Sequence, residues 1–427
     1  MKRLRFVHAA DLHVDSPFRG MSALPERIRE RIRESTYGAL KELVTVAIEA
    51  QVDFVLISGD VYDLSDRSLR AQIRFQKAME QLAARDIPVF IIHGNHDPED
   101  GRAAKLDWPA AVHFFACDQV QTFQVEKANR GVIAQIHGIS YRTSAVTENL
   151  ARQFTADNTS IYQIGLLHTN VDGDLGHDNY APCTKQDLIA AGMHYWALGH
   201  VHTRKVLHEQ HPTIVYPGNV QGRSIRETGA RGCYVVDVHE DGRAELTFHA
   251  LDQVRWFHEQ IPVAGLQTEQ ELKDRLGEEM ERLRQDVNGR DAVVRFVLEG
   301  RSKVHALLRK GRALDELIAQ FREDESERSP FVWIEGIEDR TGSEIDFEAY
   351  LQEKSFLGDL LRYSQALQED DIALATFVSE ALAPLQNLPK AAAGLPSELN
   401  PDQLREWLRA AEELAADLLV GDGGWKE

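Results

Sequence analysis

Residues 87–100 read IPVFIIHGNHDPED, a short apolar run that stops at a glycine and is followed by asparagine, histidine and aspartate. The run is rich in β-branched residues and short enough to be a buried strand. Four more apolar runs, at 4–10, 53–58, 164–168 and 195–199, also end in metal-ligand residue types. These residues are Asp11 and His13, Asp60, His168, and His200 and His202, to which the quoted run adds Asn95 and His96. Helical periodicity at 25–51 and 69–84 separates the runs and predicts an α/β layered fold.

The strand ends predict a single metal centre. In α/β sheets, ligands bind beyond the carboxyl ends of the strands, so residues far apart in the sequence are expected to converge there. Imidazoles, carboxylates and one amide oxygen, with no thiolate, suit divalent manganese, iron or zinc. Two such ions, about 3.5–4 Å apart, stabilise an in-line displacement at phosphorus. Asp60 follows a glycine that permits a tight turn, and we expect it to be the ligand shared by both ions.

The order of all five motifs makes the indication of a metal centre specific, because Asp-x-His or His-x-His alone is common. His8, His93 and His137 lie in or beside strands and are interpreted as buried residues or as supports of the ligands. The ordered set spans residues 6–220 and resembles the calcineurin-like metallophosphoesterase superfamily. The longer stretches AADLHVDSPFRG (9–20), GDVYDLSDRSLRAQ (59–72), LGHVHTRKV (198–206) and YPGNVQGRSIRETGARGCY (216–234) resemble SbcD-like DNA-repair exonucleases, most closely the YhaO-type proteins of bacilli.

The resemblance implies roles for these residues. One metal would be held by Asp11, His13, Asp60 and His202, and the other by Asp60, Asn95, His168 and His200. His96 would contact the scissile phosphate and protonate the leaving oxygen, which suits an imidazole with an ordinary pKa of about 6.5. Asp97 would orient His96. The implied substrate is DNA, cut from a 3′ end or as a single strand, with manganese as the usual cofactor.

The resemblance also implies an architecture and partners. We expect a four-layer α/β/β/α sandwich at 1–253, a small α/β capping domain at 254–340 and a helical C-terminal region at 341–427. The last helix should begin with Asn400 as its N-cap, Pro401 in its first turn and Gln403 as the capping-box partner. Its apolar stripe either packs on its own domain or docks a partner helix. The expected partners are an SMC-like ATPase and a second copy of the chain.

Charge and composition bear on the substrate and on the compartment. A formal net charge of −20 argues against a nucleic-acid partner, since phosphate binding relies on Lys and Arg. Residues 261–427, however, hold 35 acids and 20 bases, so most of the excess acid lies outside the motifs. Three widely spaced cysteines and a basic, non-apolar N-terminus predict a cytoplasmic protein, and no apolar run is long enough to span a membrane.

Basic residues near the motifs are candidates for contacts with backbone phosphates, and the alternative is scattered surface charge. The candidates are Arg19, Arg204, Arg223 and Arg226. Two rival functions remain open at this point. One is a small-substrate phosphatase or phosphodiesterase with the same metals, which would need no capping domain. The other is a non-catalytic scaffold, which the complete ligand set argues against.

Overall fold

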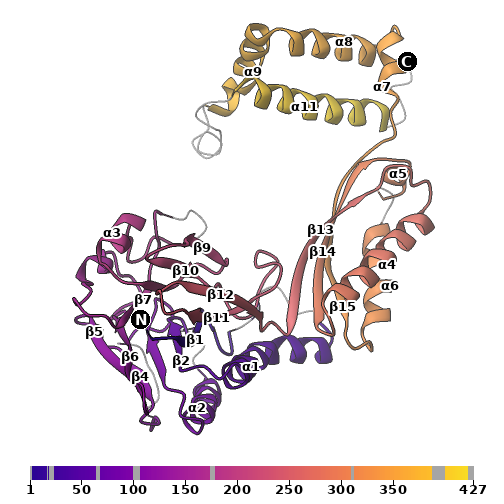
Figure 1. Cartoon of the computed structure of the whole chain (residues 1–427). Helices are drawn as coiled ribbons and strands as arrows, with labels where there is room; N and C mark the ends of the chain where they lie inside the picture. The colour runs from indigo at the N-terminus through magenta and orange to yellow at the C-terminus, as the bar shows by residue number, and fades with distance from the viewer. Residues whose placement is uncertain are drawn as a thin grey trace. The chain divides into compact units, whose positions relative to one another are not determined.

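The computed structural model describes residues 2–16, 18, 24–63, 68–99, 106–173, 178–308, 312–386 and 400–421. Figure 1 shows two large sheets formed by the first part of the chain, a smaller sheet with long strands, and a group of helices at the C-terminal end. Within the described ranges, no helix is long and apolar enough to cross a membrane.

The first large sheet has six strands in the order β12-β11-β1-β2-β3-β4. Its strands are β1 (Leu4–Ala9), β2 (Phe54–Ser58), β3 (Val89–Ile92), β4 (Val112–Phe114), β11 (Gly232–Val238) and β12 (Ala244–Ala250). Strands β1 to β4 run parallel to one another. β11 pairs with β1, and β12 pairs with β11, both in antiparallel orientation. β2 and β3 are buried at every position, which explains their unbroken apolar sequences.

The second large sheet has the order β5-β6-β7-β8-β10-β9. Its strands are β5 (Gln121–Lys127), β6 (Gly131–Gly138), β7 (Tyr162–His168), β8 (Tyr195–Gly199), β9 (Lys205–His208) and β10 (Thr213–Tyr216). β6, β7, β8 and β10 are parallel, and β5 and β9 are antiparallel edges. Strands β4, β5 and β9 were not predicted from the sequence, because β4 has only three residues and β5 and β9 are partly exposed and mix polar with apolar residues. β6 contains His137, which was expected in or beside a strand.

The side chains of β1 alternate between two hydrophobic clusters. Phe6 faces the second sheet in a cluster that also contains Tyr195, whereas Val7 belongs to the cluster under the helices α1 (Glu26–Glu49) and α2 (Leu69–Ala83). On the outer face of the second sheet, Trp196 packs in a third cluster with residues of η2 (Leu150–Gln153) and α3 (Lys185–Ala190). The predicted four-layer α/β/β/α sandwich is therefore confirmed.

The third sheet consists of β13 (Val254–Pro262), β14 (Asp291–Arg301) and β15 (Val332–Gly342), in that order, with the helices α4 (Glu269–Asp286), α5 (Val304–Leu308) and α6 (Ala313–Glu325) between the strands. β15 runs to Gly342, two residues past the expected end of the capping domain at residue 340. In its first half, Glu335 accepts two hydrogen bonds of 2.7 Å from Arg295 of β14, and in its polar second half Arg340 lies 3.9 Å from Glu299 of β14.

The described chain forms two compact units, one of residues 1–258, 283–294 and 324–333 and one of residues 259–282, 295–323 and 334–427. The second unit includes the helices α7 (Phe347–Gln352), α8 (Phe356–Glu369), α9 (Asp371–Gln386) and α11 (Pro401–Gly421). α11 begins as predicted: the amide of Gln403 donates to Asn400 Oδ1 at 2.9 Å, and the amide of Asn400 donates to Gln403 Oε1 at 3.1 Å. These two bonds form the expected capping box.

Candidate metal centre

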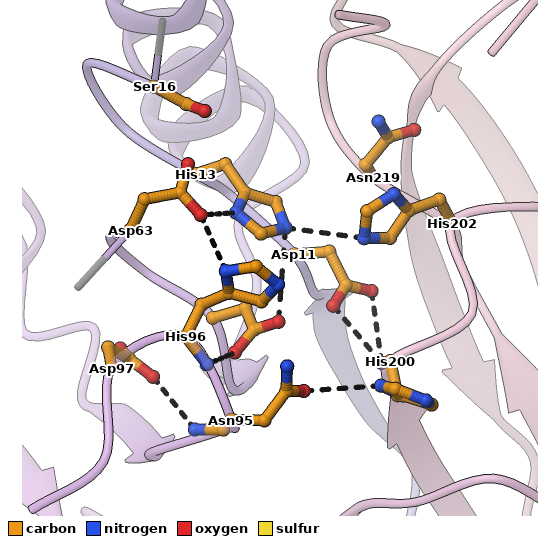
Figure 2. A network of polar contacts seen from close by, with 12 residues as sticks. Asp11, His13, Ser16, Asp63, Asn95, His96, Asp97, His200, His202 and Asn219 are labelled. Carbon is orange, nitrogen blue, oxygen red and sulfur yellow. Dashed lines mark hydrogen bonds and ion pairs between the residues drawn. The ribbon is translucent and has the colours of Figure 1, made fainter. Parts of the chain in front are cut away.

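The ends of five strands meet at one edge of the sandwich. The strand ends lie level, because Ser58 of β2 pairs with Ile92 of β3, and His168 of β7 pairs with Gly199 of β8. Asp11, Asp60 and Asn95 follow strands of the first sheet, while His168 and His200 close or follow strands of the second. Figure 2 shows the resulting group of side chains from both sheets pointing toward one another.

Several of these residues have left-handed backbone conformations, which side-chain-bearing residues rarely adopt. The φ angles are 52° at Asp11, 43° at His13, 52° at Asp60 and 102° at His200. Hydrogen bonds between neighbouring loops hold this geometry: the amide of Asp11 donates to Gly59 O at 3.1 Å, and that of His13 donates to Asp60 O at 3.0 Å. Such conformations cost about 1–3 kcal/mol each and cluster at functional sites.

One half of the centre is built on Asp11, His13 and His202, each of which offers a ligand atom within 4.8 Å of the others. The Nε2 atoms of His13 and His202 lie 3.2 Å apart. Their Nδ1 atoms donate outward to the carboxylates of Asp63 and Glu227, so in neutral imidazoles both Nε2 atoms carry lone pairs. Two lone pairs this close repel each other unless a cation lies between them.

The other half is built on Asn95, His168 and His200. Asn95 Oδ1 lies 2.9 Å from His168 Nε2 and 3.2 Å from His200 Nδ1. Both imidazoles donate from their other nitrogen to backbone carbonyls, so their inner nitrogens face Asn95 Oδ1. Burial lowers the pKa of His168, but the charge of Asp60 outweighs it and raises this pKa to about 9, so a bound cation would take the place of a proton on His168. Asp60 Oδ2 lies 3.4 Å from His168 Nε2 and 3.9 Å from His13 Nε2, within reach of both halves. The donor set thus fits two divalent cations with Asp60 between them.

The charges of the centre also favour cations. Asp11 and Asp60 are both buried, and burial raises the pKa of Asp11 to about 7. Burial also raises the pKa of Asp60, but the neighbouring His168 outweighs that effect and keeps its pKa well below the usual range. Burial lowers the pKa of His202 to about 4, so this imidazole stays neutral and able to bind a metal. A bound cation would take the place of the proton that Asp11 otherwise retains near neutral pH.

His96 lies at the rim of the centre, with 44% of its side chain exposed. Its amide donates to Asp60 Oδ1 at 2.8 Å, and its Nδ1 lies 2.8 Å from Asp63 Oδ1. Burial lowers the pKa of His96, but the hydrogen bond to Asp63 and the charge of Asp60 outweigh it, so the pKa is raised above 6.5. The imidazole is therefore suited to hold a proton near neutral pH.

Asp97 has different contacts from those expected. Its carboxylate accepts hydrogen bonds from the amides of Gly94 at 2.8 Å and Val61 at 3.0 Å, and thereby ties the loop after β3 to the loop after β2. The carboxylate that contacts the His96 ring is Asp63. The orienting role assigned to Asp97 stays a prediction, and the structure offers Asp63 for that role.

The predicted phosphate-binding arginines fall into different environments. Arg204 is exposed, with its guanidinium carbon 3.8 Å from the centre of the Phe248 ring, and Arg226 is exposed as well. Arg223 is only 18% exposed, because its guanidinium lies 3.3 Å from Asp63 Oδ2 and donates to Ser16 Oγ at 3.0 Å. Arg19 lies outside the described residues.

Asp63 and Glu227 were not singled out from the sequence. Both lie inside quoted stretches, Asp63 three residues after Asp60 and Glu227 in the segment after β10. Their only signal in the sequence is their place within those stretches, because the imidazoles that they bind lie 50 and 25 residues away.

Comparison with known proteins agrees with this geometry. Residues 4–204 match the family model for calcineurin-like phosphoesterases, and residues 256–342 match the model for the middle domain of the metallophosphoesterase YhaO. A protein of Bacillus subtilis (strain 168), described as an uncharacterized metallophosphoesterase, YhaO, is 39% identical over 343 residues, which cover 80% of this chain and 83% of that protein. The chain belongs to the calcineurin-like phosphoesterase family. The resemblance noted from the sequence is thereby confirmed.

More distant relatives are named as DNA-repair proteins or nucleases. The DNA double-strand break repair protein Mre11 of Thermoplasma acidophilum is 28% identical over 268 residues, 58% of this chain and 66% of that protein. One component of the nuclease SbcCD of Bacillus subtilis is 22% identical over 267 residues, 55% of this chain and 66% of that protein. As a calcineurin-like phosphoesterase, this chain is a metal-dependent hydrolase of phosphate esters.

Proposed function

We propose that this calcineurin-like phosphoesterase is a two-metal DNA phosphodiesterase. It would act as an exonuclease and would also cut single-stranded DNA internally. One ion would be held by Asp11, His13, Asp60 and His202, and the other by Asp60, Asn95, His168 and His200. The observation that carries the proposal is the convergence of seven donor side chains in two halves that share Asp60. Two divalent ions, with Mn²⁺ as our choice, would supply Lewis-acid activation of the phosphate and of the attacking water.

His96 is proposed as the general acid. It stands at the exposed rim of the centre, where a substrate phosphate has access, and Asp63 binds its Nδ1 so that Nε2 is available to the leaving oxygen. Hydrogen bonding to Asp63 favours the protonated imidazole, as an acid near neutral pH requires. Asp97 would contribute by fixing the backbone on which His96 stands.

DNA as the substrate is supported by the names of the Mre11 and SbcCD relatives and by exposed basic residues beside the centre. Arg204 and Arg226 are the side chains we assign to backbone phosphates, because both are exposed, Arg204 lies two residues after His202, and Arg226 precedes Glu227, which binds the His202 ring. Arg223 is engaged with Asp63, so its contribution would be to hold the centre together rather than to bind DNA.

We further propose the domain division 1–253, 254–340 and 341–427, with the middle part as a capping domain. The strands β13 to β15, which span residues 254 to 342, and the middle-domain match at 256–342 support it. The last part would bind an SMC-like ATPase. Leu404 and Leu408 of α11 pack in their own helical cluster, whereas Leu414 and Leu418 are 62% and 58% exposed and offer an apolar stripe to a partner helix. Homodimerisation and a cytoplasmic location belong to the same proposal.

The test is a time course on end-labelled single- and double-stranded DNA with Mn²⁺, run beside a chromogenic phosphodiester. Hydrolysis of DNA that is far faster than that of the small ester supports the proposal, and hydrolysis of the small ester alone points to a small-substrate phosphodiesterase. His96→Ala should lower the rate on DNA by about 10²–10⁴-fold while leaving the metal content near that of wild type. Loss of both metals in that variant would contradict the role of His96 as a non-ligand acid.

A further inference from the structure

The four imidazoles of the centre differ in the group that accepts a hydrogen bond from their outer ring nitrogen. Each turns one ring nitrogen inward and donates a hydrogen bond outward from the other. Behind His13 the acceptor is the carboxylate of Asp63, at 3.0 Å, and behind His202 it is the carboxylate of Glu227, at 2.7 Å. Figure 2 shows Asp63 next to His13 on the side away from His202. One half of the centre is therefore supported by two negative charges.

The other half is supported by neutral groups. His168 Nδ1 donates to the backbone carbonyl of Ser58 at 2.9 Å, and His200 Nε2 donates to the carbonyl of Asp178 at 2.7 Å. A carboxylate polarises an imidazole more strongly than a carbonyl does, and so makes its inner nitrogen a stronger donor to a metal. The two halves therefore differ in ligand strength although both use two imidazoles.

Glu227 is held in place for this contact. Its Oε1 accepts from His202, while its Oε2 accepts from the amide of Arg223 at 2.7 Å and from Asn219 Nδ2 at 3.0 Å. The Arg223 guanidinium lies 3.7 Å from Glu227 and 3.3 Å from Asp63, so one partly buried cation bridges the two supporting carboxylates. This bridge lets two acids stand close to the centre without repelling each other.

We infer that Glu227 is a positioning residue that, together with Asp63, sets the metal affinity of the His13/His202 half of the centre and leaves the His168/His200 half unaffected. The inference rests on the proposed two-metal assignment. It predicts two Mn²⁺ ions of unequal affinity, each dependent on different residues outside the ligand set.

The experiment measures Mn²⁺ binding to the full chain by isothermal titration calorimetry and by equilibrium dialysis with metal analysis, without any substrate. In Glu227→Gln, the amide cannot accept hydrogen bonds at both ends, so the support of His202 or the contact with Arg223 is lost. The expected result is a loss of about 10–100-fold in the affinity for one ion and no change for the other. A general structural role would weaken both ions together.

Asp291→Asn is the matched control. Asp291 is also a buried carboxylate that binds an arginine, Arg31 at 2.6 Å, and a backbone amide, that of Phe331 at 3.1 Å, but none of these contacts reaches a ligand. This variant should bind both ions like the wild type. A loss in the control equal to that in Glu227→Gln would overturn the inference.

Double variants identify which ion is affected. In a His168→Gln background, Glu227→Gln should weaken the remaining ion, whereas in a His202→Gln background it should have no further effect. The reverse pattern, or equal effects in both backgrounds, would overturn the inference. If Glu227→Gln fails to fold, Asp63→Asn carries the same test, because Asp63 supports the other imidazole of the same half.

Failure of this inference and failure of the proposed function have different signatures. A wild-type chain that binds two ions, with Glu227→Gln binding two ions at unchanged affinities, overturns the inference alone. A wild-type chain that binds a single ion overturns the two-metal proposal and the inference together. If Glu227→Gln weakens the binding of only one Mn²⁺ ion, but the chain hydrolyses no DNA, the inference is supported and only the proposed substrate is contradicted.

Discussion

Acidification should destabilise the two-sheet sandwich through His8, an imidazole of β1 that lies fully buried between the sheets. His8 Nδ1 lies 3.0 Å from the Tyr195 hydroxyl, and its Nε2 lies 3.1 Å from Ser58 Oγ and 3.2 Å from Leu198 O. These contacts join β1 and β2 to β8. Because burial disfavours the imidazolium, the pKa of His8 is lowered from 6.5 to about 3.

The sign and the size of the effect follow from this pKa. The unfolded chain takes up a proton near pH 6.5, whereas the folded chain resists protonation down to about pH 3. The stability contributed by the neutral imidazole is therefore present above pH 6.5 and is lost as the pH falls toward 3. Between pH 7.5 and pH 5.0 the loss is about 2 kcal/mol, since each pH unit below 6.5 costs about 1.4 kcal/mol.

The assay compares wild type with His8→Gln in guanidinium unfolding at both pH values, followed by tryptophan fluorescence with a chelator present. At pH 7.5 the variant should be less stable by about 1–3 kcal/mol, because glutamine satisfies the three polar partners incompletely. At pH 5.0 this difference should shrink by about 2 kcal/mol, since only the wild type bears the cost of a neutral imidazole. Other titrating groups are common to both proteins and cancel. A difference that stays the same at the two pH values would refute the reasoning.

Three further substitutions, one of them a control, test the site and the packing of the sheets. Asp63→Asn, assayed on end-labelled single-stranded DNA at saturating Mn²⁺, should lower kcat by about 10²-fold or more, because the alkoxide leaving group of DNA needs a proton and His96 loses the carboxylate that keeps it protonated; an unchanged kcat would exclude that role. Gly165→Ala should destabilise the second sheet by about 1–3 kcal/mol, because a Cβ would lie 2.4 Å from the Trp196 ring. Gly336→Ala, where an added Cβ meets nothing within 4 Å, should change the unfolding free energy by less than about 0.5 kcal/mol, and equal losses in both variants would contradict the packing argument.

The ligand-bearing strands could be predicted because two independent patterns coincide in them. β1, β2, β3, β7 and β8 are buried and therefore apolar, and each is followed or closed by a residue type that binds metals. The carboxyl ends of parallel strands lie at the same edge of a sheet, so motifs that are far apart in the sequence lie close together in the structure. β5 and β9 lie at sheet edges and are partly exposed to solvent, and their mixed composition gave no comparable signal.

The residues that support the ligands could not be predicted in the same way. Arg223 has the sequence signature of a phosphate-binding arginine, a basic residue in a loop beside the ligands. Its actual partners are Glu227, four positions later in the chain, Asp63, 160 positions earlier, and Ser16, 207 positions earlier. Nothing in the local sequence distinguishes an arginine that faces solvent from one that bridges two buried carboxylates. Burial separates the two cases, and burial is a property of the packed fold.

Which aspartate contacts His96 also depends on the packed fold. The resemblance implied Asp97 for this role, but neighbouring side chains on a tight turn point in different directions. With His96 at the rim, the Asp97 side chain turns inward to the amides of Gly94 and Val61. Asp63 reaches His96 from the loop after β2, which β2 and β3 bring alongside the loop after β3 through their parallel pairing. One Asp63 oxygen thus contacts both His13 and His96, so a change at Asp63 alters a ligand and the proposed acid together, whereas a change at Asp97 acts on the loops that carry them.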